Sequence, residues 1–409
     1  MNKVSNIFNS TFYNSIHTMS KIFLKRSEDK RIRGGHLWVF SNEIEKIFAN
    51  PENGDLVEVF DSKEQFLGLG FYNKNSLIAV RLISKSRVEN SSDLFRDRIM
   101  CAYDLRKNFY PHRESFRLVF SESDFLPGLI IDKYNNSFVL QVNSFGIQRN
   151  IDLIIEILKS DLSAQNIFTK NDFYLRKLEG LPEEDNVYFG SISKEVIDDG
   201  SIKYKIDFNQ SQKTGFYFDQ SDNRFFIEKI VKDKTVADIF SNSGGFGLHA
   251  LKAGAKSVDF VDSSVREIER VKENLLLNNL DANAKYFVKD VFDFLEEAIA
   301  LNKRYDVVIL DPPAFAKNKK SLPAAEKGYE KLNKLAFQVV NDGGYLATSS
   351  CSYHLIKENF FNFLNRAASK SSSEIQLIHF GGASLDHPQL SGMPETSYLK
   401  FAVFKVFNR

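Results

Sequence analysis

Two side chains of this sequence have the types and the placement for covalent chemistry, and each follows an apolar run. Residues 305–310 read YDVVIL and are followed by Asp311 and two prolines, and residues 344–348 lead through two serines to Cys351. The prolines stiffen the chain and remove N–H donors, and in open α/β sheets the ligand crevice lies outside the carboxyl ends of the strands. The sequence therefore predicts that Asp311 and Cys351 border one pocket, as an acid and a thiol.

An acid and a thiolate in one pocket fit the methylation of a carbon that is a poor nucleophile, such as C5 of cytosine. Cys351 would attack C6 and form a transient covalent bond, while Asp311, protonated or sharing a proton with N3, would stabilise the adduct. C5 would then take a methyl group from a sulfonium, and loss of the C5 proton would release Cys351 by β-elimination. The alternative for Cys351 is a small buried apolar residue, but its position after a strand and its pairing with Asp311 favour a nucleophile.

A glycine-rich turn between an expected strand and an expected helix predicts a cofactor site. The strand at 235–239 is followed by FSNS and then by GGFG, which opens the helix. Glycines let a ligand approach the backbone, and a helix N-terminus offers unpaired N–H groups. Gly245, Gly247 and Ala250 also match the dinucleotide pattern G-x-G-x-x-[GA], so an NAD(P) oxidoreductase is one reading of this turn.

Acidic residues after the neighbouring strands favour S-adenosylmethionine over NAD(P). Asp262 ends the next strand, where an acid accepts hydrogen bonds from ribose hydroxyls. Asp238 lies near the end of the first strand, Asp290 follows the third and Asp311 follows the fourth. This set resembles the class I S-adenosylmethionine-dependent methyltransferases, although Asp290 alone also fits a helix cap. By that resemblance the cofactor-binding residues are Phe240, Ser241, Asn242, Ser243, Gly244, Gly245, Asp262, Ser263, Asp290, Val291, Phe292, Asp311 and Pro312.

The periodicity of the chain predicts which elements position these residues. From about residue 200 strands alternate with helices, which is typical of a doubly wound parallel sheet. Upstream, short β-rich runs separated by turns predict a small β barrel and then an α+β module. The expected strands are 56–60, 66–72, 77–82, 117–121, 128–132, 137–142, pieces near 166–176, 235–239, 257–261, 285–288 and 305–310. The expected helices are 93–108, 147–160, 245–253, 264–278 and 291–302.

The composition is that of a globular chain without a global preference for nucleic acid. The 409 residues carry 54 Lys and Arg against 53 Asp and Glu, a net charge of +1, so RNA binding would depend on local patches. Only Cys101 and Cys351 are present, which argues against a disulfide framework or a zinc cluster and suits a reducing cytoplasm. No apolar run approaches the roughly 18 residues of a spanning helix. We therefore expect a cytoplasmic protein that binds no membrane and no metal.

Several stretches make a family resemblance specific. DPPAFAKNKKSL, KGYEKLNKLAF, GGYLATSSCS, DHP and PETSYLKF resemble the ribosomal RNA large subunit methyltransferase I family of 23S rRNA cytosine-5 methyltransferases. Upstream, SESDFLPGLIIDKYNNSFVLQ, RKLEGL, QKTGFYFDQSDNR and FSNSGGFGLHA match the same family. GGHLWVFSNEI matches its N-terminal PUA-like domain, so the resemblance covers nearly everything after residue 20.

The resemblance implies S-adenosylmethionine as cofactor and 23S rRNA as partner, with Cys351 as the nucleophile and Asp311 as the acid that contacts the base. Because the patterned sequence begins at Lys21, we expect residues 1–20 to form an extension that is disordered or precedes a native start at Met19, and three domains to come after it. These are a PUA-like RNA-binding domain at 21–88, an α+β central domain at 89–195 and a Rossmann-like methyltransferase domain at 196–409. A homodimer is one candidate for the oligomeric state.

A basic strip at 21–33 in the expected barrel indicates a surface for RNA. This strip leads into a Gly-Gly turn and the only Trp, an arrangement that can track a phosphate backbone. A solvated face and a core Trp are the alternative. The candidates for RNA binding are Arg33, Gly35, His36, Trp38 and Lys213.

The sequence departs from the family pattern at two positions, and other functions remain open. Ser221 stands where family members often have Arg, and Ala314 stands where many RNA cytosine-5 methyltransferases have a second Cys, so the base that removes the C5 proton is unassigned. An rRNA guanine or adenine N-methyltransferase would use the Asp-Pro-Pro motif without a covalent step. A catalytically silent RNA-binding assembly factor would keep only the fold.

Overall fold

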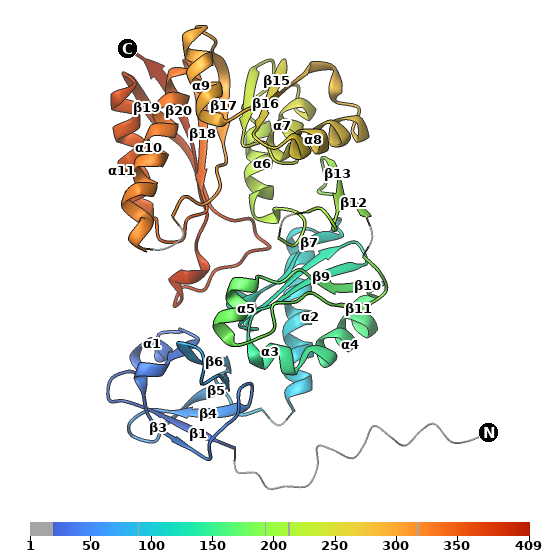
Figure 1. Ribbon diagram of the computed structural model, residues 1–409, viewed down its shortest axis with the longest axis vertical. Helices are drawn as coiled ribbons and strands as arrows, with labels where there is room; N and C mark the ends of the chain where they lie inside the picture. Colours follow the sequence, from blue (N-terminus) through green and yellow to red (C-terminus); the bar gives the residue numbers. More distant parts are fainter. Residues whose placement is uncertain (1–18, 89, 193, 212, 317–318) are drawn as a thin grey trace, which may run out of the picture.

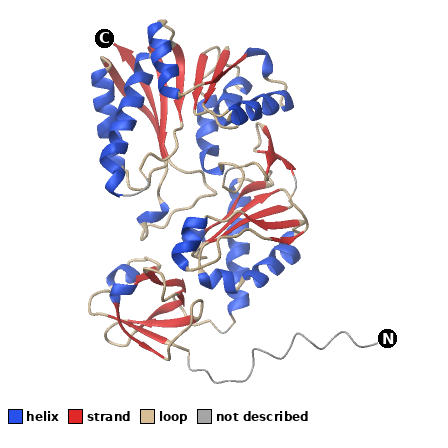
Figure 2. Ribbon diagram, viewed as in Figure 1, coloured by secondary structure: helices blue, strands red, loops and turns tan. Residues whose placement is uncertain are grey.

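The computed structural model describes residues 19–88, 90–192, 194–211, 213–316 and 319–409, and it arranges them around three β-sheets and one hairpin (Figure 1). Residues 1–18 of the expected N-terminal extension lie outside the described residues, as do Lys317 and Asn318 of the DPPAFAKNKKSL stretch. Helices and strands are interspersed along the described chain (Figure 2). The described part is therefore an α/β protein, as predicted.

The first sheet has six strands in the order β2-β6-β5-β4-β1-β3. Gly54 turns the chain before β4 with a φ of +87°, a conformation that suits a residue without a Cβ. Alternating apolar residues such as Ile22, Val39 and Val57 form a separate core for this sheet. The elements are β1 (Lys21–Leu24), α1 (Lys30–Arg33), β2 (Trp38–Phe40), η1 (Ser41–Glu43), β3 (Ile44–Phe48), β4 (Leu56–Phe60), β5 (Phe66–Tyr72) and β6 (Ile78–Ser84).

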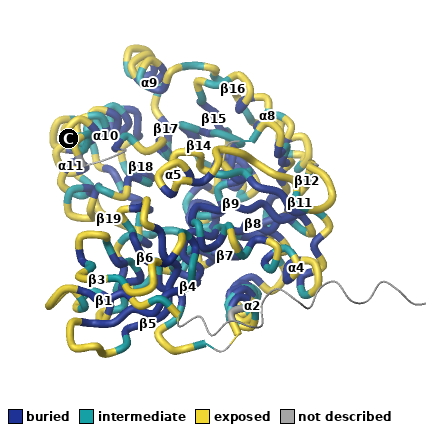
Figure 3. Tube along the Cα trace, turned by 60° about the horizontal axis from the view of Figure 1, so that its bottom comes forward, coloured by how far each residue is buried: buried dark blue, intermediate teal, exposed yellow. Residues whose placement is uncertain are grey.

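The second sheet has five strands in the order β11-β10-β9-β8-β7, and β7, β8 and β9 are largely buried (Figure 3). Helices α2 and α4 pack on it through apolar residues such as Phe95 and Ile154. The elements are α2 (Ser91–Phe109), β7 (Ser115–Phe120), η2 (Ser121–Asp124), β8 (Leu129–Tyr134), β9 (Ser137–Val142), α3 (Phe145–Arg149), α4 (Ile151–Leu162), β10 (Asn166–Thr169), α5 (Phe173–Glu179) and β11 (Val187–Phe189).

One predicted strand region is partly wrong. Of the strand-like pieces expected near 166–176, only β10 is a strand, and the chain from Phe173 is the helix α5. The Asp172 side chain accepts a hydrogen bond from the Leu175 amide at 3.1 Å, and Gly180 ends the helix with a φ of +76°. These are ordinary helix start and stop signals, and they outweigh the short apolar run that resembles a strand.

The third sheet has seven strands in the order β16-β15-β14-β17-β18-β20-β19, after a hairpin of β12 and β13. Strands β16, β15, β14, β17 and β18 run parallel, and β20 is antiparallel to both of its neighbours. The elements are β12 (Lys194–Asp198), β13 (Lys203–Asp207), η3 (Phe218–Gln220), α6 (Ser221–Glu228), β14 (Thr235–Ile239), α7 (Gly245–Lys252), β15 (Ser257–Asp262), α8 (Val265–Leu277), η4 (Asp281–Asn283), β16 (Ala284–Val288), α9 (Val291–Ala300), β17 (Tyr305–Leu310), η5 (Lys319–Ser321), α10 (Leu322–Gln338), β18 (Val340–Ser350), α11 (Lys357–Lys370), β19 (Ser373–Gly381), η6 (Pro394–Thr396) and β20 (Lys400–Asn408). The expected domain division at residue 195/196 falls within β12.

Helices cover both faces of this sheet, which confirms the doubly wound class. Val236 packs with α6, α7 and α8, and the next residue, Ala237, packs with α9, α10 and α11. The two groups of helices lie on opposite sides of the strands in Figure 1. Because the parallel strands are buried on both faces, they are continuous apolar runs, and this is why β14 and β17 were predicted with their correct starts.

The segment between β19 and β20 returns to the other two sheets. Met393 packs in the core of the first sheet. Arg106 of α2 is fully buried, donates to both carboxylate oxygens of Asp124 at 2.6 and 2.7 Å, and donates to the Asp386 carbonyl at 2.8 Å. The Asp386 carboxylate accepts from the Arg117 amide at 2.9 Å. This segment therefore joins the C-terminal sheet to both upstream sheets, and Asp386 belongs to the DHP stretch that marked the family resemblance.

A buried histidine clamp holds the helix that follows the glycine-rich turn. His249 on α7 is fully buried, and its Nε2 and Nδ1 lie 2.8 Å from Asp199 Oδ2 and 2.6 Å from Glu228 Oε1. Burial lowers the pKa of His249, but the hydrogen bonds to both carboxylates outweigh burial and raise it above 6.5. The same hydrogen bonds lower the pKa values of Asp199 and Glu228 against the effect of burial. The clamp thus favours a protonated imidazole between two ionised carboxylates.

We expect the stability that the clamp contributes to depend on pH in both directions. Because the pKa of His249 is raised, its contribution to stability is complete below pH 6.5 and is lost as the pH rises through the folded-state pKa. Because the carboxyl pKa values are lowered, the contribution of Asp199 and Glu228 is complete above pH 4.5 and is lost as the pH falls through their folded-state pKa values. His249→Gln should lower the unfolding free energy by about 3 kcal/mol at pH near 6 and flatten the loss of thermal stability above that pH. Calorimetry of wild type and variant over this range checks it, and parallel curves would contradict a charged His249.

Candidate active site

The acid of the Asp-Pro-Pro motif is held by two donors on one of its oxygens. Asp311 follows β17, and its Oδ1 accepts hydrogen bonds from Gln220 Nε2 at 2.8 Å and from Ser349 Oγ. Asn223 Nδ2 donates to Gln220 Oε1 at 2.7 Å, which orients the Gln220 amide so that its nitrogen faces the acid. Burial raises the pKa of Asp311 to about 6, although the Ser349 and Gln220 hydrogen bonds oppose this effect. Asp311 can therefore carry or share a proton near neutral pH, and both of the donors seen among the described residues lie on Oδ1 rather than Oδ2.

The thiol lies beyond the end of the adjacent strand. Strands β17 and β18 are parallel with Leu310 opposite Thr348, so Asp311 and Cys351 both follow strand ends at one edge of the sheet. Burial, followed by the Asp311 carboxylate, raises the pKa of Cys351 to about 11, and the charge of Lys213 acts in the opposite direction. The thiol thus needs further stabilisation of its thiolate to act as a nucleophile at neutral pH.

A tyrosine on α10 connects the loops that carry the acid and the thiol. Tyr329 is fully buried, and its hydroxyl accepts from the Phe315 amide at 3.3 Å in the loop after Asp311. The same hydroxyl lies 2.9 Å from Ser352 Oγ and 3.1 Å from Ser350 Oγ, on either side of the thiol. Ser352 Oγ also accepts from the Ala316 amide at 3.3 Å. The two loops are therefore tied to each other as well as to the sheet.

The glycine-rich turn has the backbone shape expected of a ligand cradle. Gly244 has a φ of +85°, and a Cβ there would come within 2.4 Å of Leu248 Cδ1, so the turn requires glycine. The Asn242 amide donates to Asp262 Oδ2 at 3.0 Å, which holds the turn against the end of β15. Asp238 lies beneath the turn, accepts from the Gly247 amide at 2.8 Å, and has a pKa that burial raises to about 7.

Buried polar groups without partners border this turn. Arg224 on α6 is 5 % exposed, and a Cβ on Gly245 would come within 2.6 Å of its Nε. Its Nη2 donates to the Tyr217 carbonyl at 3.0 Å, but Nε and Nη1 have no hydrogen-bond partner among the described residues, and neither does the buried Oγ of Ser241. Buried donors normally have partners, and a guanidinium prefers a carboxylate. The turn therefore fits the amino-acid end of S-adenosylmethionine.

The other predicted cofactor residues lie at the same edge of the sheet. Asp262 ends β15 and is partly exposed, and Ser263 follows it and is exposed, as ribose contacts require. Asp290 caps α9 by accepting from the Phe292 and Asp293 amides at 2.8 and 3.4 Å, so the helix-cap alternative accounts for its side chain. The cofactor residues after β14, β15 and β17 thus share one edge, and those after β16 extend it.

Four of the five predicted RNA-binding residues contact other parts of the chain. Trp38 Nε1 donates to Glu122 Oε1 at 2.9 Å, and His36 is buried with its Nε2 3.4 Å from Glu395 Oε2. Arg33 pairs with Asp29 and Asp61 at 2.5 and 2.6 Å, and a Cβ on Gly35 would lie 3.6 Å from the Gly392 Cα. Lys213 is exposed and influences the thiol. The RNA role of all five stays a prediction.

Several residues of the site were not predicted, because their roles depend on distant contacts. Arg224, Gln220 and Asn223 lie in the QKTGFYFDQSDNR stretch, whose family match was the available signal. In that stretch Ser221, the departure from the family pattern, accepts a hydrogen bond from Arg113 Nη1 at 2.8 Å. At the position where family members often have Arg, the described structure thus has a serine that is contacted by Arg113 from another segment.

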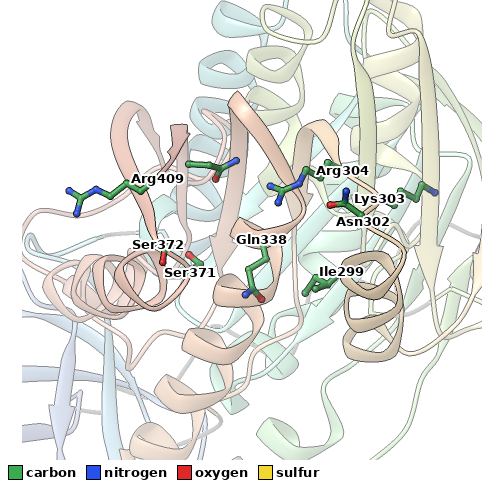
Figure 4. Close-up of a pocket in the computed structure, with 9 residues that line it drawn as sticks. Ile299, Asn302, Lys303, Arg304, Gln338, Ser371, Ser372 and Arg409 are labelled. Atoms are coloured by element: carbon green, nitrogen blue, oxygen red, sulfur yellow. The ribbon is translucent and has the colours of Figure 1, made fainter.

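A hollow at the opposite edge of the sheet is separate from this site. Asn302, Lys303, Arg304 and Arg409 border it (Figure 4), near the starts of β17 and β18. Lys303 is paired with Asp259.

Over the described ranges, no helix is long and apolar enough to cross a membrane, and no group of three or more His, Cys, Asp or Glu side chains is suited to hold a metal ion.

Comparisons with known proteins agree with the fold and with S-adenosylmethionine as the cofactor. Residues 22–85 match the PUA-like domain family and residues 190–391 match the S-adenosylmethionine-dependent methyltransferase family. A crystal structure described provisionally as a SAM-dependent methyltransferase from Streptococcus mutans aligns with a TM-score of 0.80 at 22% identity, covering 94% of this chain and 99% of that one. A further methyltransferase structure with the same score is complexed with S-adenosylhomocysteine. Fold, site and family matches define an S-adenosylmethionine-dependent methyltransferase with an N-terminal PUA-like domain.

Full-length relatives identify the family more closely. Ribosomal RNA large subunit methyltransferase I of Aeromonas salmonicida is 35% identical over 390 residues, 94% of this chain and 98% of that protein. The proteins of the same name from Vibrio cholerae and Aliivibrio fischeri are 36% and 37% identical, covering 94% and 93% of this chain and 99% and 97% of their own lengths. The chain belongs to the ribosomal RNA large subunit methyltransferase I family.

Proposed function

We propose that this methyltransferase forms 5-methylcytosine in 23S rRNA, with Cys351 as the nucleophile and Asp311 as the acid. The observation that carries the proposal is the pairing of β17 with β18 beside the glycine-rich turn, because it brings an acid, a thiol and a methyl-donor site to one sheet edge. Support for ribosomal RNA as substrate comes from the names of the relatives. Such a substrate implies work in the cytoplasm.

The side chains support a covalent route to the methylated base. The Cys351 thiolate would form a bond from Sγ to C6 of cytosine, and Asp311 would hold a proton at N3 while negative charge develops on the ring. Gln220 and Ser349 both donate to Oδ1 of Asp311, so Oδ2 is the oxygen for N3. S-adenosylmethionine, when bound, supplies the methyl group on its sulfonium. After C5 has lost its proton, Cys351 would leave C6 by β-elimination.

The proposed cofactor residues divide by the part of the ligand they would contact. The methionine part would lie in the turn formed by Phe240, Ser241, Asn242, Ser243, Gly244 and Gly245, with the carboxylate against Arg224. Asp262 and Ser263 would bind the ribose, and Asp290, Val291 and Phe292 would surround the adenine. Pro312 and Asp311 would close the site on the side of the base. The first sheet would bind rRNA, and Lys213 would meet the RNA beside Cys351.

The test is methyl transfer from labelled S-adenosylmethionine to 23S rRNA that lacks its modifications, followed by nucleoside analysis. We expect label in 5-methylcytidine. Label in methylguanosine or methyladenosine would instead mean that the Asp-Pro-Pro motif acts on a base nitrogen without a covalent step. Absence of transfer together with absence of S-adenosylmethionine binding would indicate a catalytically silent assembly factor. RNA that already carries the modification is the matched control and should accept no label.

A further inference from the structure

A buried lysine of the last strand lies beside the proposed nucleophile. Lys400 opens β20 and is paired across the sheet with Ser350, the residue before Cys351. The residue is 7 % exposed, and its Nζ donates to the carbonyl of Ser352 at 2.7 Å and to the carbonyl of Tyr398 at 2.7 Å. Lys400 therefore holds the backbone at Ser352, the residue that follows Cys351.

The charge of Lys400 has no acidic partner within ion-pair distance among the described residues. Its two acceptors are neutral carbonyls, and among the described ion pairs none includes it. Burying an ammonium without a counter-ion is costly, and burial lowers the pKa of Lys400 to about 8 while Cys351 acts in the opposite direction. At neutral pH the amine is still mainly protonated, and Cys351, the residue before its acceptor Ser352, is the titratable group whose negative charge favours the protonated amine.

The other charged and titratable groups described around the thiol do not supply a buried positive charge. Asp311 and Asp219 raise the pKa of Cys351, and thus disfavour its thiolate, whereas Lys213 favours it. Lys213 is exposed to solvent and lies over the Tyr217 ring at 5.2 Å, so water screens its charge. Tyr329 has a raised pKa because of burial and stays neutral. Lys400 is therefore the buried cation next to the thiol loop.

We propose that Lys400 is a positioning residue that stabilises the Cys351 thiolate and fixes the loop from which it attacks. This inference rests on the proposed function, in which Cys351 is the nucleophile. As the thiol loses its proton to solvent, Lys400 keeps its own proton and becomes the counter-ion of the sulfur. When Sγ bonds to C6, the negative charge moves into the base toward Asp311, and elimination returns it to the sulfur beside Lys400.

The thiol can be observed alone, because the chain has two cysteines and Cys101 is exposed on α2. In a Cys101→Ala background, the rate of alkylation by iodoacetamide as a function of pH reports the apparent pKa of Cys351. We expect Lys400→Met to raise this apparent pKa by about one unit or more, which is about a tenfold loss of thiolate at neutral pH. Lys400→Arg should restore most of the reactivity, because it keeps the charge.

The matched control is Lys213→Met, which removes an exposed cation near the same thiol and should shift the alkylation profile less. S-adenosylmethionine binding and the thermal midpoint identify a variant that fails to fold. If Lys400→Met fails to fold, the alkylation profile of Lys400→Arg is compared with that of wild type instead. An unshifted alkylation profile in Lys400→Met would overturn the proposal, even if methylation falls. Because alkylation needs no RNA, this result is independent of whether the protein methylates cytosine.

Discussion

Replacing Cys351 by alanine is expected to reduce methyl transfer to 23S rRNA by about four orders of magnitude or more. C5 of cytosine becomes nucleophilic only while C6 carries the thiolate, so loss of the sulfur removes the reaction path itself. The affinity for S-adenosylmethionine should stay within about twofold of wild type, because the glycine-rich turn and Asp262 do not depend on the thiol. Single-turnover transfer of labelled methyl and calorimetric titration of the cofactor measure the two quantities.

Trapping the adduct gives a second readout of the same variant. RNA that contains 5-fluorocytidine cannot lose a proton from C5, so the wild-type protein should remain attached to it through Cys351 after denaturation. Cys351→Ala should form no such complex, whereas Cys101→Ala should form as much as wild type. Equal loss of cofactor binding and methyl transfer in Cys351→Ala would mean that the thiol is structural. Undiminished transfer would mean that a base nitrogen is the acceptor.

Replacing Arg224 by methionine is expected to weaken S-adenosylmethionine binding by about a hundredfold. Nε and Nη1 of Arg224 are buried without partners beside the glycine-rich turn, and two charge-assisted hydrogen bonds to a carboxylate are worth about 3 kcal/mol or more. Methionine retains an unbranched side chain between Phe216 and Phe246, which limits the loss of packing. Isothermal titration of the two proteins with S-adenosylmethionine measures the effect.

Methylthioadenosine separates the carboxylate contact from general damage to the site, because it keeps the adenosine part and lacks the amino-acid part. Its affinity should be almost unchanged in Arg224→Met and clearly reduced in Asp262→Ala, where the ribose contact is removed. Arg224→Lys keeps the charge without the planar fork and should be intermediate. Equal losses of both ligands in Arg224→Met would show that the arginine supports the fold rather than the carboxylate.

The parts of the fold that were predicted well are those in which local pattern and burial agree. Strands β9 and β14 have their predicted bounds, and helices α7, α8 and α9 begin within one residue of the prediction, because apolar runs alternate with amphipathic stretches and turn signals. The helix α5 was missed because the prediction followed a short apolar run and gave no weight to the helix cap at Asp172. The antiparallel β20 was not predicted, and its pairing with β18 joins residues 50 to 60 positions apart, which no local pattern reveals.

The candidate site divides in the same way. Asp311, Cys351 and the glycine-rich turn were proposed from the sequence, because each comes directly after a strand and carries a residue type with its own chemistry. Arg224, Tyr329 and Lys400 were not, because an arginine, a tyrosine or a lysine is ordinary on a helix or a strand until its partners are known. Their roles depend on a buried guanidinium without partners, a hydroxyl shared by two loops and an ammonium between two carbonyls.

The sequence by itself determined the class of fold, the family and the methyl donor, and it singled out the acid and the thiol that we propose for the reaction, since all of these depend on residue type and on short spacings along the chain. Only the tertiary structure decided that Asp311 receives both donors on one oxygen, that Trp38 and His36 contact Glu122 and Glu395, and that Lys400 binds the carbonyl of the residue after Cys351. The physical reason is that hydrogen bonds and the burial of charge are set by neighbours in space. In this chain those neighbours come from strands and loops far apart in sequence.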